Sequence, residues 1–166
     1  ITKLESDNMS LEKSEFNIIS IINNVFEMLE IQANKKNISL LIDSKLKRVN
    51  VNADQEKIHQ VLTNLIENSV KYGKQDGTTE ISIEDLIEDK LIIRITDNGK
   101  GIKKEHFERL FERFYRVESS GNRSTGGSGL GLAIVKHIID AHNEKIYVES
   151  DFGIGSEFSF SLQKSN

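Results

Sequence analysis

The spacing of apolar residues changes several times along this chain of 166 residues, and these changes constrain the fold more than any other feature. In residues 18–33 and 58–66, apolar side chains recur every three or four positions, which predicts two amphipathic helices. Asp54 offers a carboxylate to cap the start of the second helix, and Gly73 predicts its end. In residues 130–142, apolar side chains lie nearly all round a helix, which predicts a third helix buried on most sides.

Short runs of β-branched and aromatic residues predict strands between and after these helices. In the last run, Phe158, Phe160 and Leu162 alternate with serines, which indicates one buried face. The predicted strands are residues 15–17, 38–43, 48–52, 80–87, 91–96, 146–150 and 157–162, with 80–96 forming a hairpin. Together the elements predict an α+β fold, a two-layer α/β sandwich with a mostly antiparallel, mixed sheet and three main helices on one face.

Composition excludes several classes of site. The chain has no cysteine, and therefore no disulfide or thiolate metal site. Its four histidines share no spacing typical of metal ligands, so we expect each to be structural or solvent-exposed. With 22 basic and 26 acidic residues, the net charge of -4 argues against nucleic-acid binding by phosphate neutralisation. No apolar run approaches the roughly 20 residues that span a bilayer, so we expect no membrane contact by this chain. The length fits one domain.

The second predicted helix carries a polar strip beside its apolar stripe. Asn64, Asn68, Lys71 and Tyr72 fall within an arc of roughly 100°. Asparagine oxygens suit Mg²⁺, which usually shares its coordination shell with phosphates, and the Lys71 ammonium could meet the same phosphates. Taken alone, the strip is more typical of a solvated helix edge, and Glu67 is typical of an ion-pair partner for Lys71.

A second candidate feature follows the strand predicted at residues 91–96. Asp97 stands at its end, in the sequence Asp-Asn-Gly-Lys-Gly that includes Gly99 and Gly101. A carboxylate fixed at a strand end can accept a hydrogen bond from an amino group such as that of adenine, and the glycines would let the backbone approach a flat ring. The alternative is a plain turn, because Asn-Gly and Gly-x-Gly are common turn formers.

Glycines gather again where the third helix begins, at Gly126, Gly127, Gly129 and Gly131. Such a sequence exposes backbone N–H groups and the positive end of a helix dipole, which favours phosphate binding. The spacing matches neither a P-loop nor a dinucleotide-binding fingerprint. The alternative is a flexible loop whose glycines permit close helix packing.

The segment between the two glycine clusters predicts a mobile lid over residues 119–127. Its guanidinium groups could close on phosphates, although at least one is typical of a surface ion pair. The arginines are Arg113, Arg116 and Arg123. The aromatic residues that would anchor its base, or simply belong to the core, are Phe111, Phe114 and Tyr115.

In this order, the segments resemble the ATP-binding catalytic domain of bacterial sensor histidine kinases, which belongs to a wider family with gyrase, Hsp90 and MutL. Five stretches carry the resemblance: residues 64–72 are similar to the N box, 97–102 to the G1 box, 111–116 to the F box, 126–132 to the G2 box and 153–158 to the terminal glycine box. The resemblance implies the Bergerat ATP-binding fold over residues 14–166. It also implies that residues 1–13 are a linker and the tail of a hairpin helix, although a frayed linker alone explains their spacing equally well.

The resemblance also implies roles for individual residues. Asn68 would be the Mg²⁺ ligand, Asp97 would accept a hydrogen bond from the adenine amine, and Arg116 would reach the γ-phosphate. The residues implied in catalysis are Arg116, Lys71 and Asn64. The residues implied in nucleotide binding are Asn64, Asn68, Lys71, Tyr72, Asp97, Gly99, Gly101, Ile102, Arg116, Gly127, Gly129, Leu130, Gly131, Leu132 and Ser156.

The function implied is binding of ATP with Mg²⁺ and transfer of the γ-phosphate to a histidine on a dimerisation hairpin of a two-component sensor kinase. Where hydrolysing relatives carry a glutamate that activates water, this chain has Asn64, which cannot act as a base. The phosphoacceptor histidine is not in this sequence, so we expect no self-phosphorylation. The alternatives are an anti-sigma-type serine kinase with the same ATP site and a catalytically silent nucleotide-sensing domain.

The same resemblance implies a setting for the chain. We expect the fragment to be monomeric and its parent to be a homodimer, with a response regulator downstream. The domain would be cytoplasmic, and its parent an inner-membrane sensor.

Overall fold

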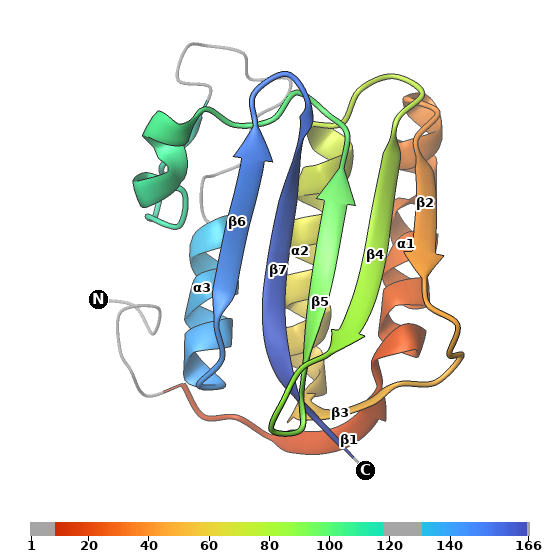
Figure 1. The fold of residues 1–166 in the computed structure, drawn as a ribbon, viewed down its shortest axis with the longest axis vertical. Coiled ribbons are helices and arrows are strands. Elements are labelled where there is room, and N and C mark those ends of the chain that lie inside the picture. The colour runs from red at the N-terminus through yellow and green to blue at the C-terminus, as the bar shows by residue number, and fades with distance from the viewer. Residues whose placement is uncertain (1–8, 118–130, 166) are drawn as a thin grey trace.

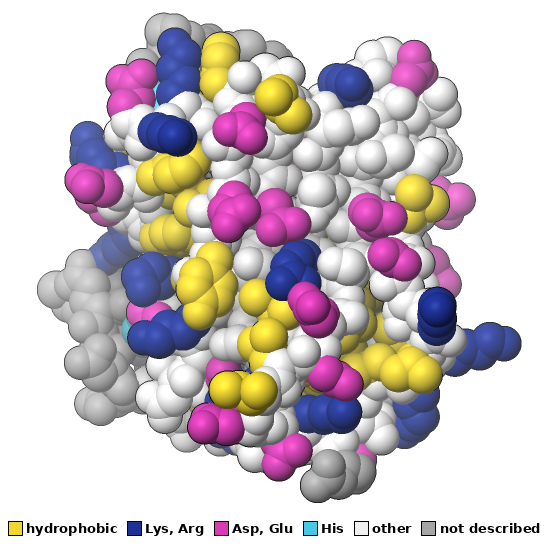
Figure 2. Space-filling view, viewed as in Figure 1, with side chains coloured by type: hydrophobic (Ala, Val, Ile, Leu, Met, Phe, Trp, Pro, Cys, Tyr) yellow, Lys and Arg dark blue, Asp and Glu magenta, His cyan; other side chains and the backbone are white. Residues whose placement is uncertain are grey.

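The computed structural model describes residues 9–117 and 131–165. Within them, a seven-stranded sheet forms one layer and three α-helices cover one of its faces (Figure 1). On the other face, acidic, basic and apolar side chains are interspersed (Figure 2). None of the helices in the described ranges is long and apolar enough to cross a membrane. The two-layer α+β architecture predicted from the apolar spacing is confirmed.

The sheet is mixed, as predicted, because β2 runs parallel to β4 while the other pairs are antiparallel. Its order is β1-β3-β7-β5-β4-β2, and β6 also pairs with β7. The strands are β1 (Lys13–Asn17), β2 (Ser39–Asp43), β3 (Asn50–Asp54), β4 (Thr78–Asp85), β5 (Lys90–Asp97), β6 (Ile146–Asp151) and β7 (Gly155–Lys164). β5 is a central strand and ends at Asp97, so this carboxylate lies where the strand leaves the sheet and a loop begins.

The helices are α1 (Ile18–Lys35), α2 (Gln55–Lys71) and α3 (Gly131–Ala141), with a short 3-10 helix, η2 (Lys104–Arg109). Asp54 caps α2 as predicted, since its Oδ1 accepts a hydrogen bond from the backbone N–H of Lys57 at 3.2 Å. The helix ends at Lys71, followed by the cap residue Tyr72 and by Gly73. The start and end of α2 were therefore both readable from local sequence.

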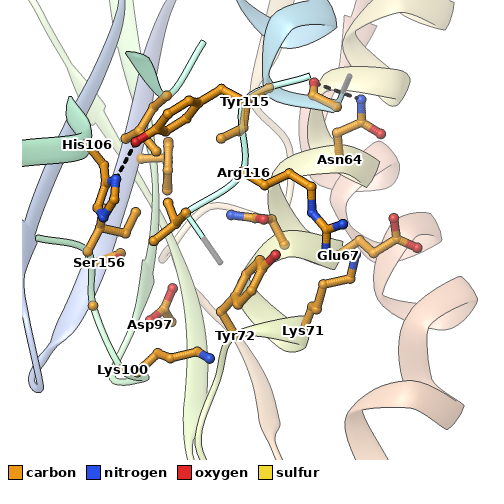
Figure 3. Close-up of a pocket in the computed structure, with 18 of the residues that line it drawn as sticks. Asn64, Glu67, Lys71, Tyr72, Asp97, Lys100, His106, Tyr115, Arg116 and Ser156 are labelled. Atoms are coloured by element: carbon orange, nitrogen blue, oxygen red, sulfur yellow. Dashed lines mark hydrogen bonds between the residues drawn. The ribbon is translucent and has the colours of Figure 1, made fainter. Parts of the chain in front are cut away.

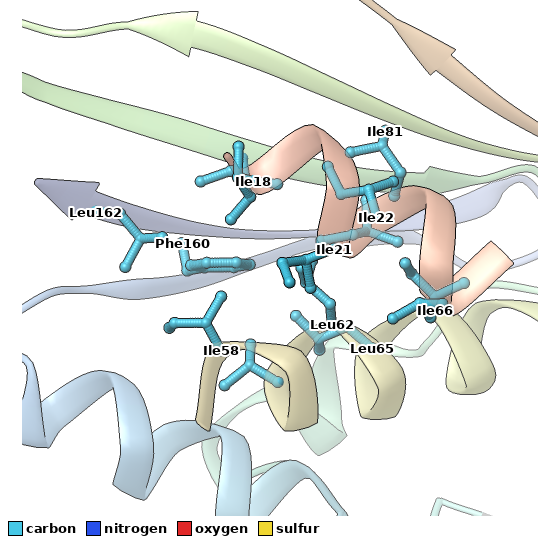
Figure 4. Close-up of a cluster of buried hydrophobic side chains, with 14 of the residues drawn as sticks. Ile18, Ile21, Ile22, Ile58, Leu62, Leu65, Ile66, Ile81, Phe160 and Leu162 are labelled. Carbon is cyan, nitrogen blue, oxygen red and sulfur yellow. The ribbon is translucent and has the colours of Figure 1, made fainter. Parts of the chain in front are cut away.

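The core lies between α1, α2 and the inner face of the sheet (Figure 4). The side chains that meet there include Ile18, Ile22, Ile58, Leu62, Leu65, Ile66, Ile81, Phe160 and Leu162, all 1% exposed or less. Each such side chain contributes roughly 1.5–3 kcal/mol by leaving water. This packing holds the apolar stripe of α2 against the sheet, and it thereby fixes where the polar strip of the same helix points.

Helix α3 differs from its prediction in part. Buried apolar residues occupy one side of it, but Lys136 and Asp140 are exposed and form an ion pair of 3.0 Å one turn apart. Leu132 and Ile134 are only partly buried. The helix is buried or partly buried except along the face of Lys136 and Asp140, but some of its apolar residues face a cavity rather than the core.

His142 fits its predicted structural role. It is buried after the end of α3, where Nδ1–H donates to the carbonyl oxygen of Ile138 at 2.8 Å and Nε2 accepts from the backbone N–H of Asp54 at 3.0 Å. Both bonds together require a neutral ring. Burial lowers the pKa of His142, and its hydrogen bond to Ile138 opposes that shift. The residue joins the end of α3 to the start of α2.

Some boundaries moved relative to the sequence prediction. Strand β1 begins at Lys13, because its pairing with β3 extends to Asp54, and η2 was not predicted at all. Residues 1–8, the first part of the predicted linker and hairpin tail, lie outside the described residues. The domain boundary near residue 13 stays a prediction.

Candidate functional site

A cavity of about 740 Å³ opens between α2, the ends of β5 and β7, and the segment that includes η2 (Figure 3). Segments far apart in the sequence meet in it. The site residues implied by the sequence that line it are Asn64, Asn68, Lys71, Tyr72, Asp97, Gly101, Ile102, Arg116, Gly131, Leu132 and Ser156. Gly99 lies in the loop that borders it. The implied residues Gly127, Gly129 and Leu130, and the predicted lid over 119–127, lie outside the described residues.

Helix α2 contributes one polar strip to the cavity. Asn64, Asn68 and Lys71 line it as predicted, and Gln60 and Glu67 extend the same strip. These positions are three or four residues apart, so they share one face of the helix. The sequence could have indicated Gln60, which continues the spacing by one turn, and it gave Glu67 only a role as an ion-pair partner. The structure shows that this face is a cavity wall.

The start of α3 lies opposite the middle of α2. Asn64 Nδ2 donates to the carbonyl oxygen of Gly131 at 3.3 Å and ties the two helices together. A Cβ added to Gly131 would lie 3.9 Å from the Asn64 amide, which is an ordinary contact. Leu132 and Ile134 line the cavity from the same turn. The first turn of α3 therefore forms part of the wall, and phosphate binding there stays a prediction.

Hydroxyl groups surround Asp97 where β5 ends. Its cross-strand neighbours are Thr79 on β4 and Ser156 on β7, and Ser69 on α2 hydrogen-bonds to its side chain. Ser69 and Thr79 are buried, with their oxygens 2.7 Å apart. The backbone N–H of Gly99 donates to Asp97 Oδ1 at 2.9 Å. The carboxylate is thus oriented from several sides while it still lines the cavity.

Burial disfavours the ionised form of the Asp97 carboxyl group. Burial raises the pKa of Asp97 above its ordinary value of 3.8, and hydrogen bonds from Gly99, Ser156 and Ser69 oppose the shift. A ligand group that donates a hydrogen bond would replace the lost water and favour the ionised form. We call Asp97, Ile102, Ser156 and the apolar Phe158 the Asp97 end of the cavity. Its chemistry suits a flat apolar ring that carries an amino group.

Two glycines let the loop after β5 pack closely against its neighbours. A Cβ on Gly99 would overlap the carbonyl oxygen of Tyr72 and lie 2.9 Å from the Cα of Gly73. Gly101 has a φ of +71°, and a Cβ there would overlap the carbonyl oxygen of Asp151. The sequence suggested approach to a ligand as the reason for these glycines. The structure adds a second reason, which is close backbone packing around the site.

Cationic side chains gather on another wall of the cavity. Lys71 Nζ lies 6.0 Å and Lys100 Nζ 5.4 Å from the centre of the Tyr72 ring. Figure 3 shows Arg116 extending toward Lys71 and Glu67. We call Lys71, Lys100 and Arg116 the cationic side. Cations that line a shared cleft favour an anionic ligand, so the cavity can accept a ring at one end and phosphates along this side.

Several lining residues were not predicted. His106 on η2 lines the cavity and hydrogen-bonds through Nδ1 to the hydroxyl of Tyr115, whose ring lies 4.6 Å from the Arg109 guanidinium. Phe152 lines the cavity from the turn between β6 and β7, with Lys103 Nζ 4.9 Å from its ring centre. Because these residues belong to irregular segments, no periodic signal in the sequence could have placed them.

The aromatic residues expected at the base of the lid separate in the structure. Phe111 packs against the core, with its ring centre 6.3 Å from that of Phe158. Tyr115 lines the cavity. Phe114 is 63% exposed and has a φ of +67°. Its ring lies 5.5 Å from the Arg113 guanidinium and does not belong to the core.

Comparison with protein families decides the assignment. Residues 53–166 match the model of the "Histidine kinase-, DNA gyrase B-, and HSP90-like ATPase" family. The chain belongs to this family. The matched range includes the polar strip of α2, Asp97 and α3, which are the parts of this ATPase-family domain that line the cavity. The resemblance inferred from the five sequence stretches is therefore confirmed.

Individual relatives narrow the comparison to histidine kinases. The chain is 36% identical over 159 residues to the sensor protein kinase WalK of Staphylococcus aureus, covering 95% of this chain and 37% of that protein. It spans about a quarter of the WalK proteins of other strains, at 26%. Among solved structures, the catalytic domain of histidine kinase ThkA superposes with a TM-score of 0.79 at 31% identity, covering 93% of this chain and 97% of that one. The ATPase-family domain here is thus homologous to histidine kinase catalytic domains.

Two further structures show related domains in assemblies. Full-length ShkA in complex with AMPPNP matches with a TM-score of 0.84 at 25% identity, covering 99% of this chain and 34% of that one. ThkA in complex with the response regulator protein TrrA matches with a TM-score of 0.76 at 30% identity, covering 93% and 42%. Domains with this fold therefore occur in ShkA, which was solved with AMPPNP, and in a histidine kinase that was solved with a response regulator protein.

Few of the donor atoms at the cavity suit Mg²⁺ without help from a ligand. Asn68 lines the cavity beside Glu67 and Asn64. Within residues 9–117 and 131–165, no cluster of three or more His, Asp or Glu side chains could hold a metal alone. Mg²⁺ usually takes one or two protein oxygens and completes its shell with phosphates and water. These side chains fit a magnesium ion shared with phosphates, and they do not fit an all-protein metal site.

Proposed function

We propose that this chain binds ATP with its adenine at the Asp97 end and its phosphates along the cationic side. The observation that carries the proposal is the surroundings of Asp97. A half-buried carboxylate, oriented by hydrogen bonds from Ser69, Gly99 and Ser156, borders an apolar wall, and those bonds only partly offset the cost of its burial. The exocyclic amine of adenine would donate the missing hydrogen bond, and a purine without that donor would leave the carboxylate unsatisfied.

The apolar side chains near Asp97 would hold the ring itself. Ile102 packs against the core, and its backbone N–H donates to Ser150 Oγ at 2.7 Å. Ser150 in turn hydrogen-bonds to Ser156 at 2.8 Å. This network fixes the loop after β5 on β6 and β7, so Ile102 and Phe158 form a wall of defined shape. Such a preformed wall lowers the entropy that the protein loses on binding.

The polar strip of α2 and the cationic side would hold the triphosphate. Lys71 and Arg116 would neutralise phosphate charge, and Asn64 and Asn68 would present amide groups to the same region. Asn68 is the proposed protein ligand of Mg²⁺, with Glu67 beside it on the strip. When bound, Mg²⁺ would draw charge from the phosphate oxygens and orient the γ-phosphate. The chain itself then contributes position and charge rather than covalent chemistry.

We further propose that the γ-phosphate is transferred to a histidine on a hairpin of the parent kinase. The bond between the γ-phosphorus and the β–γ bridging oxygen breaks, a bond to a ring nitrogen forms, ADP leaves, and the ring nitrogen loses its proton. Asn64 has no basic group, so the strip does not activate water at that position. We therefore expect bound ATP to keep its γ-phosphate until a histidine side chain enters the site.

The relatives support further proposals about the parent protein. A response regulator would take the phosphoryl group from the histidine, as a partner comparable to TrrA in its complex with ThkA. The parent would be a homodimeric membrane sensor, with this domain on the cytoplasmic side. The monomeric state of the isolated chain is part of the same proposal.

The decisive experiment mixes this chain with a separately produced histidine hairpin of its parent and γ-labelled ATP, with and without Mg²⁺. Transfer to the hairpin that requires Mg²⁺ and is lost on acid treatment is the expected outcome, because phosphohistidine is acid-labile. Acid-stable label on serine would show a serine kinase instead. Binding of ATP with no transfer to the hairpin would contradict the kinase proposal while leaving the nucleotide site intact.

A further inference from the structure

Lys36, a residue outside the cavity, covers the last carbonyl groups of α2. Its Nζ donates to the carbonyl oxygens of Val70 at 3.1 Å, of Lys71, and of Gly73 at 3.3 Å. The final carbonyls of a helix have no partner within the helix and carry its partial negative charge. A single ammonium therefore contacts two of them, at Val70 and Lys71, and also the carbonyl of Gly73 just beyond the helix. Lys36 is itself the cap residue at the end of α1, so it joins the ends of two helices.

Among residues 70–73, the carbonyl group of Tyr72 is bound by another part of the chain than Lys36. The backbone N–H of Lys100 donates to the carbonyl oxygen of Tyr72 at 3.4 Å, and the absence of a side chain at Gly99 permits that approach. The end of α2 thus lies between the end of α1 and the loop that follows Asp97. The two residues that α2 sends into the cavity from this end are Lys71 and Tyr72.

The backbone around Lys36 is also fixed. Its carbonyl oxygen accepts from the backbone N–H of Asp76 at 2.8 Å, and the next residue, Asn37, donates from Nδ2 to Asp76 Oδ1 at 2.8 Å. The turn after α2 is therefore tied to the turn after α1 by backbone and side chain. The ammonium of Lys36 reaches the carbonyls of α2 from an anchored position.

Burial of the ammonium strengthens its hydrogen bonds. Burial lowers the pKa of Lys36 from its ordinary value, and the charge of Lys100 adds to that shift. A partly desolvated cation interacts with carbonyl dipoles in surroundings of lower polarity than water.

We propose that Lys36 is a positioning residue for nucleotide binding, because it fixes the end of α2 and so the direction in which Lys71 and Tyr72 enter the cavity. The inference rests on the proposed ATP site. It gives α1, which contributes no residue to the cavity wall, a defined part in ATP affinity. Loss of the ammonium would loosen the last turn of α2 and leave the Asp97 end as it is.

The test measures ATP affinity of this 166-residue chain by calorimetry in Lys36→Met, Lys36→Arg and the matched control Lys35→Met. Lys35 is the exposed neighbour in the last turn of α1. We expect Lys36→Met to raise the Kd for ATP about tenfold, Lys36→Arg to recover most of the affinity, and Lys35→Met to change nothing. Hydrogen exchange at the Tyr72 and Gly73 amides should accelerate in Lys36→Met.

Three results would overturn the inference: wild-type affinity in Lys36→Met, equal loss in Lys35→Met, or lost affinity with unchanged exchange at those two amides. If Lys36→Met does not fold, Lys36→Gln is measured by the same criteria. The variant Asp97→Asn separates the two levels of the argument. If the wild-type chain binds no ATP, the proposed site fails. If Asp97→Asn loses binding and Lys36→Met does not, only the role of Lys36 fails.

Discussion

The two parts of the cavity are built in different ways. At the Asp97 end, a strand end, backbone N–H groups and buried hydroxyls hold one carboxylate in place. On the cationic side, the charges stand at the ends of long side chains, Lys71, Lys100 and Arg116. The first part loses little freedom when a ligand binds, whereas the second must order flexible chains. Base recognition should therefore be preformed, and phosphate recognition should be adjustable and sensitive to salt.

The largest expected effect comes from removing the charge at the preformed end. Asp97→Asn keeps the shape but replaces an acceptor with an amide that faces the adenine amine with its own donor. We expect ATP and adenosine affinity to fall about 100-fold, since an unsatisfied buried donor costs about 1–3 kcal/mol in addition to the lost bond. Calorimetry checks this, with the exposed Asp43→Asn as control. Adenosine binding that survives in Asp97→Asn would remove the assignment of this end to adenine.

The next effect tests whether the loop after β5 is rigid because of packing. Gly101 and Gly153 both have positive φ, at +71° and +85°, but a Cβ overlaps the Asp151 carbonyl only at Gly101 and meets nothing within 4 Å at Gly153. Both alanine variants carry the left-handed strain of roughly 1 kcal/mol. We expect Gly101→Ala to lose about 2 kcal/mol more of the free energy of unfolding, measured with denaturant. Equal losses would show that packing at this loop is not what holds it.

A smaller effect is expected on the adjustable side. Lys71→Met should weaken ATP binding about tenfold and leave adenosine binding unchanged, because the ammonium serves only the phosphates. Added salt should weaken ATP binding by the wild-type chain, so the difference in ATP affinity between the wild-type chain and Lys71→Met should become smaller. The exposed Lys74→Met is the control. If Lys71→Met weakened adenosine and ATP alike, the two parts of the cavity would not be separable.

The smallest expected effect is a change of pH, which should act in opposite directions on the stability of the fold and on ATP affinity. The folded pKa of Asp97 lies above its unfolded value, so the ionised group costs stability above the folded pKa, and this cost disappears as pH falls toward 3.8. ATP binding should move the other way, because the adenine amine donates to the ionised form. Acidification should thus weaken ATP affinity while relieving the Asp97 cost, and Asp97→Asn should remove both trends. Parallel thermal and calorimetric titrations check the two slopes.

Features that depend on local sequence were well predicted. The spacing of Asn64, Asn68 and Lys71 placed them on one face of α2, and Asp54 marked its first turn. Prediction failed where apolar residues had two possible surroundings. Ile134 was expected in a buried helix, yet it lines the cavity beside Leu132, which the resemblance had implied in nucleotide binding, because a periodic pattern does not distinguish a core from a pocket wall.

The sequence by itself determined the helices, the order of the glycine-bearing stretches and the family resemblance, because periodicity and motif spacing are properties of neighbouring residues. Only the tertiary structure decided that Ser69 and Thr79 join Ser156 around Asp97. It also brought Lys36 to the end of α2, across 34 residues from Val70. Such contacts arise when the sheet and helices pack, and long-range packing leaves no periodic trace in the chain. The sequence could therefore suggest Asp97 as an adenine acceptor, whereas Ser69 and Thr79, which help to surround it, could not be identified from the sequence.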